Sequence, residues 1–286
     1  MKILLTGGDG FIGSHLKKFL SKNHEIFEVK RLKKNIQKNK NILYYDNNIN
    51  DLLNFFNLHK PEIVVHLASL FISEHNVNDV SNLINDNILF SAQLVECAKK
   101  SECYNFLNTG TSWQNYNDKI YEPVNLYAST KEAFLKILYY YHIAHHINCI
   151  TLKLFDSYGP NDKRKKLFYY LNSSKNDGIL EMTKGLQMIN ILHVDDICAG
   201  FIKAIDLFKK DEGIFETYAL SASENISLKD LVQKYIEINN LSLKINWGGK
   251  KYKEREVIIP WSKYQILPNW KPLVSLEKGL RDLNFD

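Results

Sequence analysis

The sequence predicts an α/β protein built on a doubly wound parallel sheet, with a smaller lobe formed mainly by its C-terminal part. Short apolar runs of strand type alternate with helix-length stretches from the first residue, and a glycine-rich turn joins the first strand to the first helix. The length of 286 residues suits one enzyme-sized unit with a larger and a smaller lobe. Alternation of this kind places parallel strands in one sheet and helices on both of its faces.

The composition is that of an ordinary globular chain. The formal net charge is only +5, and the cationic residues are scattered, so we expect no nucleic acid as partner. The apolar run at 63–72 is shorter than the about 20 residues of a membrane span, and no signal-peptide pattern follows Met1. We therefore expect a cytoplasmic protein with no membrane partner. Four cysteines without C-x-x-C spacing predict buried free thiols, and the histidines have no ligand-spaced companions that would predict a metal.

The elements follow one another in the order that such a sheet requires. Helices are expected at 13–21, in a long amphipathic stretch that ends at Lys99, and after Ser129, where apolar residues on more than one face predict burial against the sheet. Strands are expected at 2–6, 25–29, 63–68, 105–109 and 150–155, and the chain returns to an apolar segment at 191–207.

The turn after the first strand carries the first chemical signal. It reads Thr-Gly-Gly-Asp-Gly-Phe-Ile-Gly-Ser over residues 6–14, with glycines three apart. Gly7 allows a tight turn, Gly10 lets backbone N–H groups approach a pyrophosphate, and Gly13 lets the helix pack close to the sheet. The pattern predicts a Rossmann-type dinucleotide site, with Phe11 and Ile12 in the first helical turn beside the phosphates.

The end of the second strand favours NADP(H). An acidic residue is expected there to hold the ribose 2′-hydroxyl of NAD, and this chain has Lys30 followed by Arg31. Two cations suit a 2′-phosphate through charge-assisted hydrogen bonds. The pair could instead begin a solvated basic face, and Glu28 would be the acid if the strand register differed, so NAD(H) remains possible.

A catalytic pair is expected at the start of the helix near residue 130. Tyr127 and Lys131 are spaced i, i+4 and share one helix face, and they follow a strand that ends in Thr109-Gly110-Thr111. A neighbouring ammonium and a cationic nicotinamide favour the phenolate and lower the pKa of the tyrosine. The hydroxyl of Thr111 would then bridge Tyr127 and a substrate oxygen.

Together these motifs resemble the extended short-chain dehydrogenase/reductase family of nucleotide-sugar epimerases, dehydratases and ketoreductases, over nearly the whole chain. The resemblance implies Thr111, Tyr127 and Lys131 as catalytic residues and a homodimer formed by the long helices ending near Lys99 and His146. It implies a dinucleotide-binding domain at 1–156, to which 191–215 returns, and a sugar-nucleotide-binding lobe at 157–190 and 216–286. Further cofactor-binding residues implied by the resemblance are Asp46, Asn47, Leu67, Ala68, Ser69 and Asn87.

At some positions this chain differs from family members of known reaction type, and these differences reduce the number of reactions to expect. Dehydratases carry an Asp-Glu pair after the catalytic hydroxyl, whereas Ser112-Trp113 stands here, which disfavours elimination. Relatives that epimerise C3 and C5 use a Cys and a His where this chain has Trp113 and Asn161, neither of which is a general acid or base at neutral pH. Reduction of a C4 keto group remains, with C4 epimerisation through a retained NAD as the alternative.

The stretches 108–114 and 252–257 resemble the subgroup that reduces CDP-linked 4-keto sugars, the CDP-abequose and CDP-paratose synthases, in surface-polysaccharide biosynthesis. We expect Arg255 to bind the substrate pyrophosphate, with Arg164 or Lys163 as weaker candidates. Asp156 replaces an Asn of many relatives, and its carboxylate would repel a pyrophosphate. Lys165 and Lys166 are expected to be solvated. The substrate-binding residues expected from these arguments are Ser112, Trp113, Asp156, Arg164 and Arg255.

Overall fold

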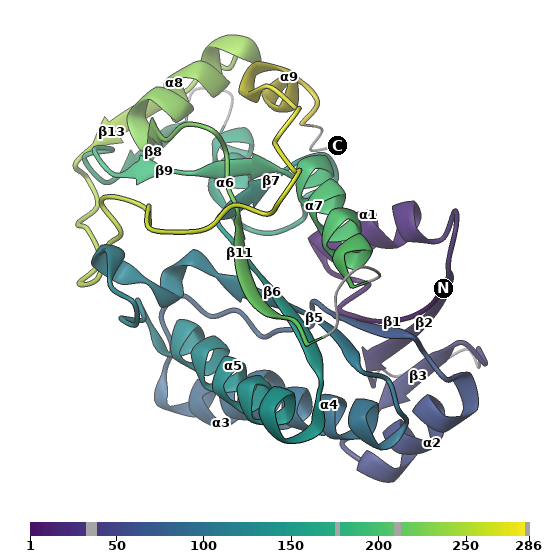
Figure 1. The fold of residues 1–286 in the computed structure, drawn as a ribbon. Coiled ribbons are helices and arrows are strands. Elements are labelled where there is room, and N and C mark those ends of the chain that lie inside the picture. The colour runs from purple at the N-terminus through teal and green to yellow at the C-terminus, as the bar shows by residue number, and fades with distance from the viewer. Residues whose placement is uncertain (33–38, 175–177, 209–212, 284–286) are drawn as a thin grey trace.

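A seven-stranded parallel sheet forms the centre of the computed structural model (Figure 1), which describes residues 1–32, 39–174, 178–208 and 213–283. Its order is β11-β6-β5-β4-β1-β2-β3. The chain therefore runs outward from β1 to β3 and returns to β4 on the other side of β1, and ligands of such sheets bind at this reversal, beyond the carboxyl ends of the strands. The strands are β1 (Lys2–Thr6), β2 (Glu25–Arg31), β3 (Ile42–Tyr45), β4 (Ile63–His66), β5 (Asn105–Thr111), β6 (Asn148–Leu154) and β11 (Phe215–Leu220).

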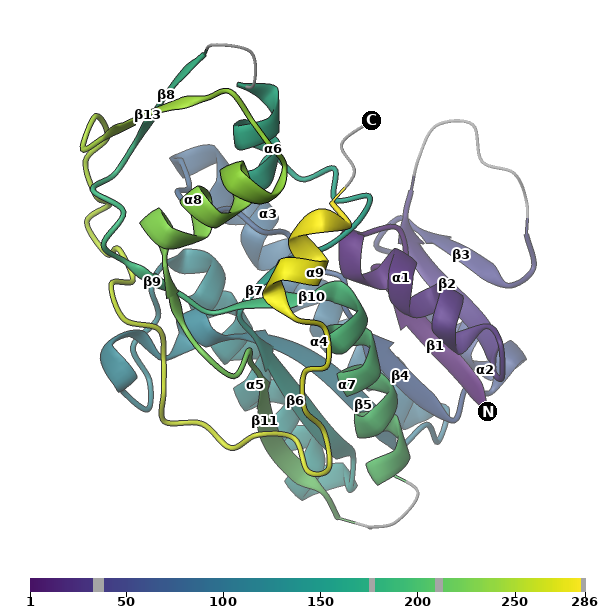
Figure 2. The ribbon, with the colours of Figure 1, turned by 90° about the horizontal axis from the view of Figure 1, so that it is seen from above.

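Helices cover both faces of the sheet (Figures 1 and 2) because successive strand residues point to opposite sides. On β1, Leu5 packs in the core beneath α1 (Phe11–Leu20) and α7 (Val194–Leu207). Leu4 packs in the other core, with α2 (Ile49–His59), α4 (Phe90–Lys100) and α5 (Leu126–His145). The predicted fold class, a doubly wound α/β sheet, is confirmed.

The long helical stretch that ends near Lys99 is interrupted in the structure. A 3₁₀ turn at Val77–Asp79 and helix α3 (Val80–Ile84) lead into a π-helical segment at Asn85–Leu89, and only then does α4 begin. The wider π turn lies at Asn87, whose side chain is buried. Single π turns inside helices are frequent at functional sites, and here the turn brings a polar side chain inward.

A smaller lobe covers one end of the sheet (top of Figure 1) and has its own apolar core, which includes Phe168, Leu231 and Tyr235. Because β11 extends to Leu220 within the main sheet, the segment returning to that sheet continues past residue 215, where we expected it to end. The elements of this lobe and its junction are β7 (Asp156–Tyr158), α6 (Leu167–Ser173), β8 (Ile179–Met182), β9 (Met188–Ile189), β10 (Ile191–His193), β12 (Ile226–Ser227), α8 (Leu228–Ile238), β13 (Lys244–Trp247) and α9 (Leu276–Arg281).

The cysteine prediction is confirmed, since all four cysteines are buried free thiols. Burial raises the pKa of the Cys97 and Cys149 thiols to about 12, which keeps them protonated and unreactive at neutral pH. Within the described ranges, no helix has the length and apolar character that crossing a membrane requires.

Candidate active site

Backbone segments pack closely around the glycine-rich turn, at positions where no side chain would fit. Gly7 has a φ of +73°, and a Cβ there would lie 2.6 Å from the backbone nitrogen of Ala68. A Cβ on Gly13 would lie 2.1 Å from the carbonyl oxygen of Gly7. Gly10 caps α1 without a side chain, so the N–H groups of the first turn, at Phe11 and Ile12, face outward beside the turn. These features fit the pyrophosphate of a dinucleotide.

A cavity of about 490 Å³ adjoins this turn and includes Lys30 and Arg31 in its wall. Lys30 Nζ lies 2.6 Å from Asp9 Oδ1 and 3.4 Å from Glu28 Oε2. Burial alone would lower the pKa of Lys30, but the two carboxylates outweigh it and raise this pKa, so Lys30 carries its charge. Arg31 forms an ion pair with Asp86 in the same wall. Both cations therefore face the cavity already paired with carboxylates.

Of the expected adenosine neighbours, Asn47 lines this cavity with a φ of +77°. Asp46 is not part of the wall and accepts a hydrogen bond from the backbone nitrogen of Asn48. Leu67, Ala68 and Ser69 also line it.

The end of β4 is held by buried side chains. Thr6 Oγ1 lies 2.7 Å from His66 Nδ1 and accepts from the backbone nitrogen of Ala68 at 3.1 Å. Burial lowers the pKa of His66 well below its usual value, so this histidine is neutral and structural. Asn87 lies behind the cavity, where its Oδ1 accepts from Ser69 Oγ at 3.0 Å and its Nδ2 donates to Thr130 Oγ1 at 3.0 Å. The resemblance implied that Asn87 contacts the cofactor, and in the chain by itself its side chain bonds Ser69, Leu70 and Thr130.

A larger cavity of about 610 Å³ contains the three expected catalytic residues. Thr111 comes from the end of β5, and Tyr127 and Lys131 come from the first turns of α5. Asn125 begins α5 by accepting a hydrogen bond from the backbone nitrogen of Ala128 at 3.0 Å. The cavity extends from Ile12 on α1 past these residues to the apolar side chains of the smaller lobe.

Burial controls the protonation of the pair. It raises the pKa of Tyr127 to about 12, and a hydrogen bond with Ser69 acts in the opposite direction. The lowered pKa expected from the nearby ammonium is not found in the chain by itself, because desolvation dominates. Burial also lowers the pKa of Lys131 to about 8. In this state Tyr127 holds its proton at neutral pH and can act as an acid.

The aromatic side chain of Phe71 is a site residue that no sequence pattern indicated. Its ring lies 5.0 Å from the Tyr127 ring and 5.6 Å from the Trp113 ring, between centroids. All three line the catalytic cavity, and Ser112 lines it as well. They form an apolar wall beside the hydroxyls of Thr111 and Tyr127, which would exclude water from that side of a bound ligand.

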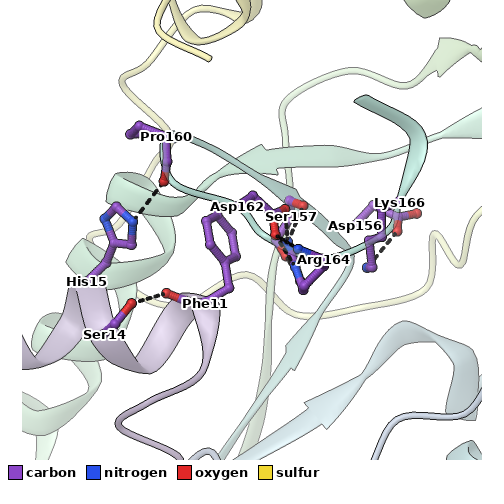
Figure 3. A network of polar contacts seen from close by, with 9 residues as sticks. All are labelled: Phe11, Ser14, His15, Asp156, Ser157, Pro160, Asp162, Arg164 and Lys166. Atoms are coloured by element: carbon purple, nitrogen blue, oxygen red, sulfur yellow. Dashed lines mark hydrogen bonds and ion pairs between the residues drawn. The ribbon is translucent and has the colours of Figure 1, made fainter. Parts of the chain in front are cut away.

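Arg164 has a different environment from the one expected (Figure 3). Its Nε and Nη2 donate to the Asp162 carboxylate at 2.7 and 2.6 Å, and Nη1 donates to Ser157 Oγ at 3.1 Å. The guanidinium lies 4.2 Å from the centre of the Phe11 ring. His15 on the same helix contacts the carbonyl oxygen of Pro160 at 3.1 Å. Arg164 thus fastens the segment after β7 to the glycine-rich turn, and its donors are engaged within the protein.

Lys166, which we expected to be solvated, instead lines the catalytic cavity. Its Nζ lies 3.8 Å from Asp156 Oδ1 and 5.4 Å from the centre of the Phe71 ring (Figure 3 shows the ion pair). Burial lowers the pKa of Lys166, and Asp156 opposes that shift. Asp156 therefore faces the cavity with its charge partly neutralised, which removes part of the repulsion expected toward a pyrophosphate.

Arg255 lies in an adjoining cavity of about 430 Å³, whose wall shares Ser112, Trp113 and Asp156 with the catalytic cavity. Its Nη2 donates to Glu122 Oε1 at 2.9 Å, and its guanidinium lies 4.6 Å from the centre of the Tyr116 ring. The pair with Glu122 is exposed, so Arg255 can exchange it for a phosphate at low cost.

No group of three or more potential metal-ligating residues is found in the parts of the chain that the structure describes.

Comparisons with known proteins agree with this geometry. A family model described as the NAD dependent epimerase/dehydratase family matches residues 3–217. CDP-abequose synthase of Yersinia pseudotuberculosis is 28% identical over 93% of both chains, and that of Salmonella typhimurium is 25% identical over 98% of this chain and 96% of its own.

Two solved structures have the same fold. UDP-glucose 4-epimerase of Thermotoga maritima with UDP-glucose superposes with a TM-score of 0.84, at 22% identity over 98% of this chain and 96% of its own. UDP-glucuronic acid 4-epimerase of Bacillus cereus, in complex with UDP-glucuronic acid and NAD, gives 0.84 at 24% identity over 99% and 97%. The family match over most of the chain, together with the glycine-rich turn and the Thr111, Tyr127 and Lys131 cavity, shows that the chain belongs to the NAD dependent epimerase/dehydratase family.

Proposed function

We propose that this protein is an NADPH-dependent ketoreductase that reduces the C4 keto group of a CDP-linked deoxy sugar. The observation that carries the proposal is the single cavity that joins Thr111, Tyr127 and Lys131 to the first turn of α1. The likeness to CDP-abequose synthases over 93% of the chain supports CDP as the nucleotide. Ser112 and Trp113 after the catalytic hydroxyl support simple reduction, because neither can remove a sugar proton or protonate a leaving hydroxide.

When bound, the reduced dinucleotide supplies the hydride for C4. Tyr127 holds its proton at neutral pH and donates it to the C4 oxygen as negative charge develops there. Thr111 donates a hydrogen bond to the same oxygen. The ammonium of Lys131 then compensates the phenolate, and its burial strengthens that interaction. Phe71 and Trp113 keep water away from the reacting face.

Lys30 and Arg31 support the choice of NADPH. Lys30 and Arg31 would hold the 2′-phosphate of NADPH through charge-assisted hydrogen bonds, in exchange for their present pairs with Asp9 and Asp86, which are partly exposed. On the substrate side, we infer that Arg255 leaves Glu122 to hold the pyrophosphate, and that Ser112, Trp113 and Asp156 contact the sugar. Arg164 acts through the loop that it holds.

The alternative is a C4 epimerase that retains NAD. The pairing of Lys30 with Asp9 and of Arg31 with Asp86 favours this alternative, because both cations are neutralised before any cofactor binds. Carboxylates at this end of the cavity could accept hydrogen bonds from the ribose hydroxyls of NAD.

One experiment distinguishes the ketoreductase from the epimerase. The protein is purified without added cofactor, any bound dinucleotide is released and identified, and the stripped protein is titrated with NADPH and NADH. Stoichiometric retained NAD supports the epimerase. An empty site that prefers NADPH, with oxidation of NADPH on addition of a CDP-linked 4-keto deoxy sugar, supports the ketoreductase, and failure of all CDP-, GDP- and dTDP-linked 4-keto sugars overturns it.

We further propose that the protein acts in the cytoplasm as a homodimer. Large apolar side chains on α5 and in the segment before α4 are exposed, among them Leu89, Tyr140 and Ile143. Burying them against a second copy would remove this surface from water. A monomeric mass in light scattering would exclude the dimer.

A further inference from the structure

A buried polar cluster lies behind the catalytic hydroxyl, outside the cavity. Gln114 is 1% exposed and Glu132 is 7% exposed. A buried carboxylate is costly unless its oxygens are paired, so a glutamate in this position needs a structural or functional reason. Glu132 directly follows the catalytic Lys131 on α5, which places it within one residue of the site.

The side-chain amide of Gln114 connects two elements of the active site. Its Nε2 donates to Glu132 Oε2 at 2.7 Å, and its Oε1 accepts from the backbone nitrogen of Thr111 at 2.9 Å. One amide group thereby joins α5, which carries Tyr127 and Lys131, to the end of β5, which carries Thr111. Because the carboxylate only accepts, it fixes which end of the amide faces Thr111.

The turn that follows Thr111 determines whether its hydroxyl donates or accepts a hydrogen bond on the side of the cavity. Thr111 begins the 3₁₀ turn Ser112–Gln114, and its Oγ1 accepts from the backbone nitrogen of Trp113 at 3.3 Å. A hydroxyl has one proton and two lone pairs, so accepting from the turn leaves its proton to donate. A donor is what the developing oxyanion of a carbonyl reduction requires.

Gly110 provides the space for this arrangement. A Cβ at this position would lie 2.8 Å from Gln114 Oε1 and 3.0 Å from Lys153 Cγ. Lys153 is buried beside the cluster, and its Nζ donates to Asn115 Oδ1 at 2.6 Å, which holds the residue after Gln114. Gln114 Oε1 can therefore lie beside the backbone nitrogen of Thr111 only because residue 110 has no side chain.

We propose that Gln114 and Glu132 are positioning residues that hold Thr111 in register with Tyr127 and Lys131, with its proton directed to the substrate oxygen. The proposal rests on the proposed function, in which Thr111 binds that oxygen. Neither residue touches substrate, so their effect is expected in kcat, with little change in KM or in dinucleotide affinity.

Three variants test the hydrogen-bond polarity. Glu132→Gln keeps an oxygen that accepts from Gln114, and we expect kcat to stay within about 3-fold of wild type. Gln114→Glu can still accept from Thr111 but opposes Glu132, and a displacement of the hydroxyl should lower kcat by about 10-fold or more. The double variant reverses the donor and acceptor of the pair, so it should recover most of the loss. A kcat unchanged in Gln114→Glu, or a double variant no better than that single variant, overturns the proposal.

Hydrogen exchange of the Thr111 amide gives a readout that needs no substrate. We expect faster exchange in Glu132→Ala than in wild type, and recovery in Glu132→Gln. Lys136→Ala is the matched control, since Lys136 pairs with Glu132 at 3.4 Å from an exposed position. Unchanged exchange in a folded Glu132→Ala overturns the positioning role. If wild type turns over no 4-keto sugar while Thr111 exchange responds as expected, the proposed reaction fails and the positioning role stands.

Discussion

The guanidinium of Arg164 lies 4.2 Å from the centre of the Phe11 ring, and this contact joins the two halves of the candidate site. Phe11 belongs to the turn expected to hold the cofactor phosphates, and Arg164 belongs to the segment that leads into the smaller lobe. The segment after β7, which carries Arg164, forms part of the wall of the catalytic cavity. Together with the contact of His15 on α1 with the carbonyl oxygen of Pro160, this stack connects the expected cofactor and substrate sites mechanically.

Replacing Arg164 with Ala should weaken both binding steps. The variant removes the stack on Phe11 and the bonds to Asp162 and Ser157, and it leaves the Asp162 carboxylate without its partner. We expect a loss of about 1–3 kcal/mol in the free energy of unfolding and a weaker affinity for NADPH as well as for substrate. Urea unfolding and fluorescence titration measure the two effects. Lys163 is the neighbouring residue, is exposed and lines none of the three cavities, so Lys163→Ala should change neither. Equal behaviour of the two variants would contradict the role of Arg164.

Replacing Tyr127 with Phe should abolish proton donation and leave the cavity intact. The ring and its contact with Phe71 remain, so we expect NADPH to bind as in wild type. The turnover number for the 4-keto substrate should fall by about 10²- to 10⁴-fold, the usual contribution of general acid catalysis. Stopped-flow or steady-state assays that follow NADPH absorbance at 340 nm measure this turnover number. Full turnover in the Phe variant would show that another group delivers the proton.

Removing both cations at the end of β2 should change the cofactor preference. In Lys30→Ala/Arg31→Ala we expect the affinity for NADPH to fall by about 10-fold or more, since hydrogen bonds to a charged group contribute about 1.5–3 kcal/mol. The affinity for NADH should change little. Equilibrium titrations of both cofactors measure the ratio directly. A similar loss for both cofactors would place these cations away from the 2′-position.

The buried lysine of the catalytic pair predicts a pH dependence of stability. Burial lowers the pKa of Lys131 to about 8, below its value of about 10.4 in the unfolded chain. Between these two values the unfolded chain binds more protons than the folded one, so stability rises with pH in this window, and the penalty for burying the charge is fully present below it. Lys131→Met should lower the slope of unfolding free energy between pH 8 and 10 by at most about 1.4 kcal/mol per pH unit.

Urea unfolding at several pH values measures this slope. Lys153 has a pKa lowered to about 8 by the same cause and contributes a rise of its own, which the Lys131 variant should retain. The exposed Lys100→Met serves as control, with a slope equal to that of wild type. An unchanged slope in Lys131→Met would mean that this ammonium is solvated.

The fold class, and the meeting of the proposed catalytic residues in one cavity, could be predicted from the sequence because local spacing determines them. Glycines at positions 7, 10 and 13 act within one turn, and Tyr127 and Lys131 share a helix face by their i, i+4 spacing. Alternation of strands and helices predicts a parallel sheet, and the carboxyl ends of parallel strands meet at one edge whatever the side chains are. These signals depend on few residues that lie close together along the chain.

The partners of individual charged side chains could not be predicted in this way. Arg164 belongs to a lysine-rich run that reads as solvent-exposed, yet it stacks on Phe11, and Lys166 of the same run faces the cavity beside Asp156. Nothing in the sequence around Glu132 distinguishes it from an ordinary helix residue, but its side chain is buried against Gln114. Hydrogen bonds and ion pairs act over a few ångströms, so which charges meet depends on how distant segments pack. The sequence by itself determined the architecture and brought the proposed reacting groups to one edge of the sheet. Only the tertiary structure decided which side chains hold those groups in place, because packing alone brings their partners within bonding distance.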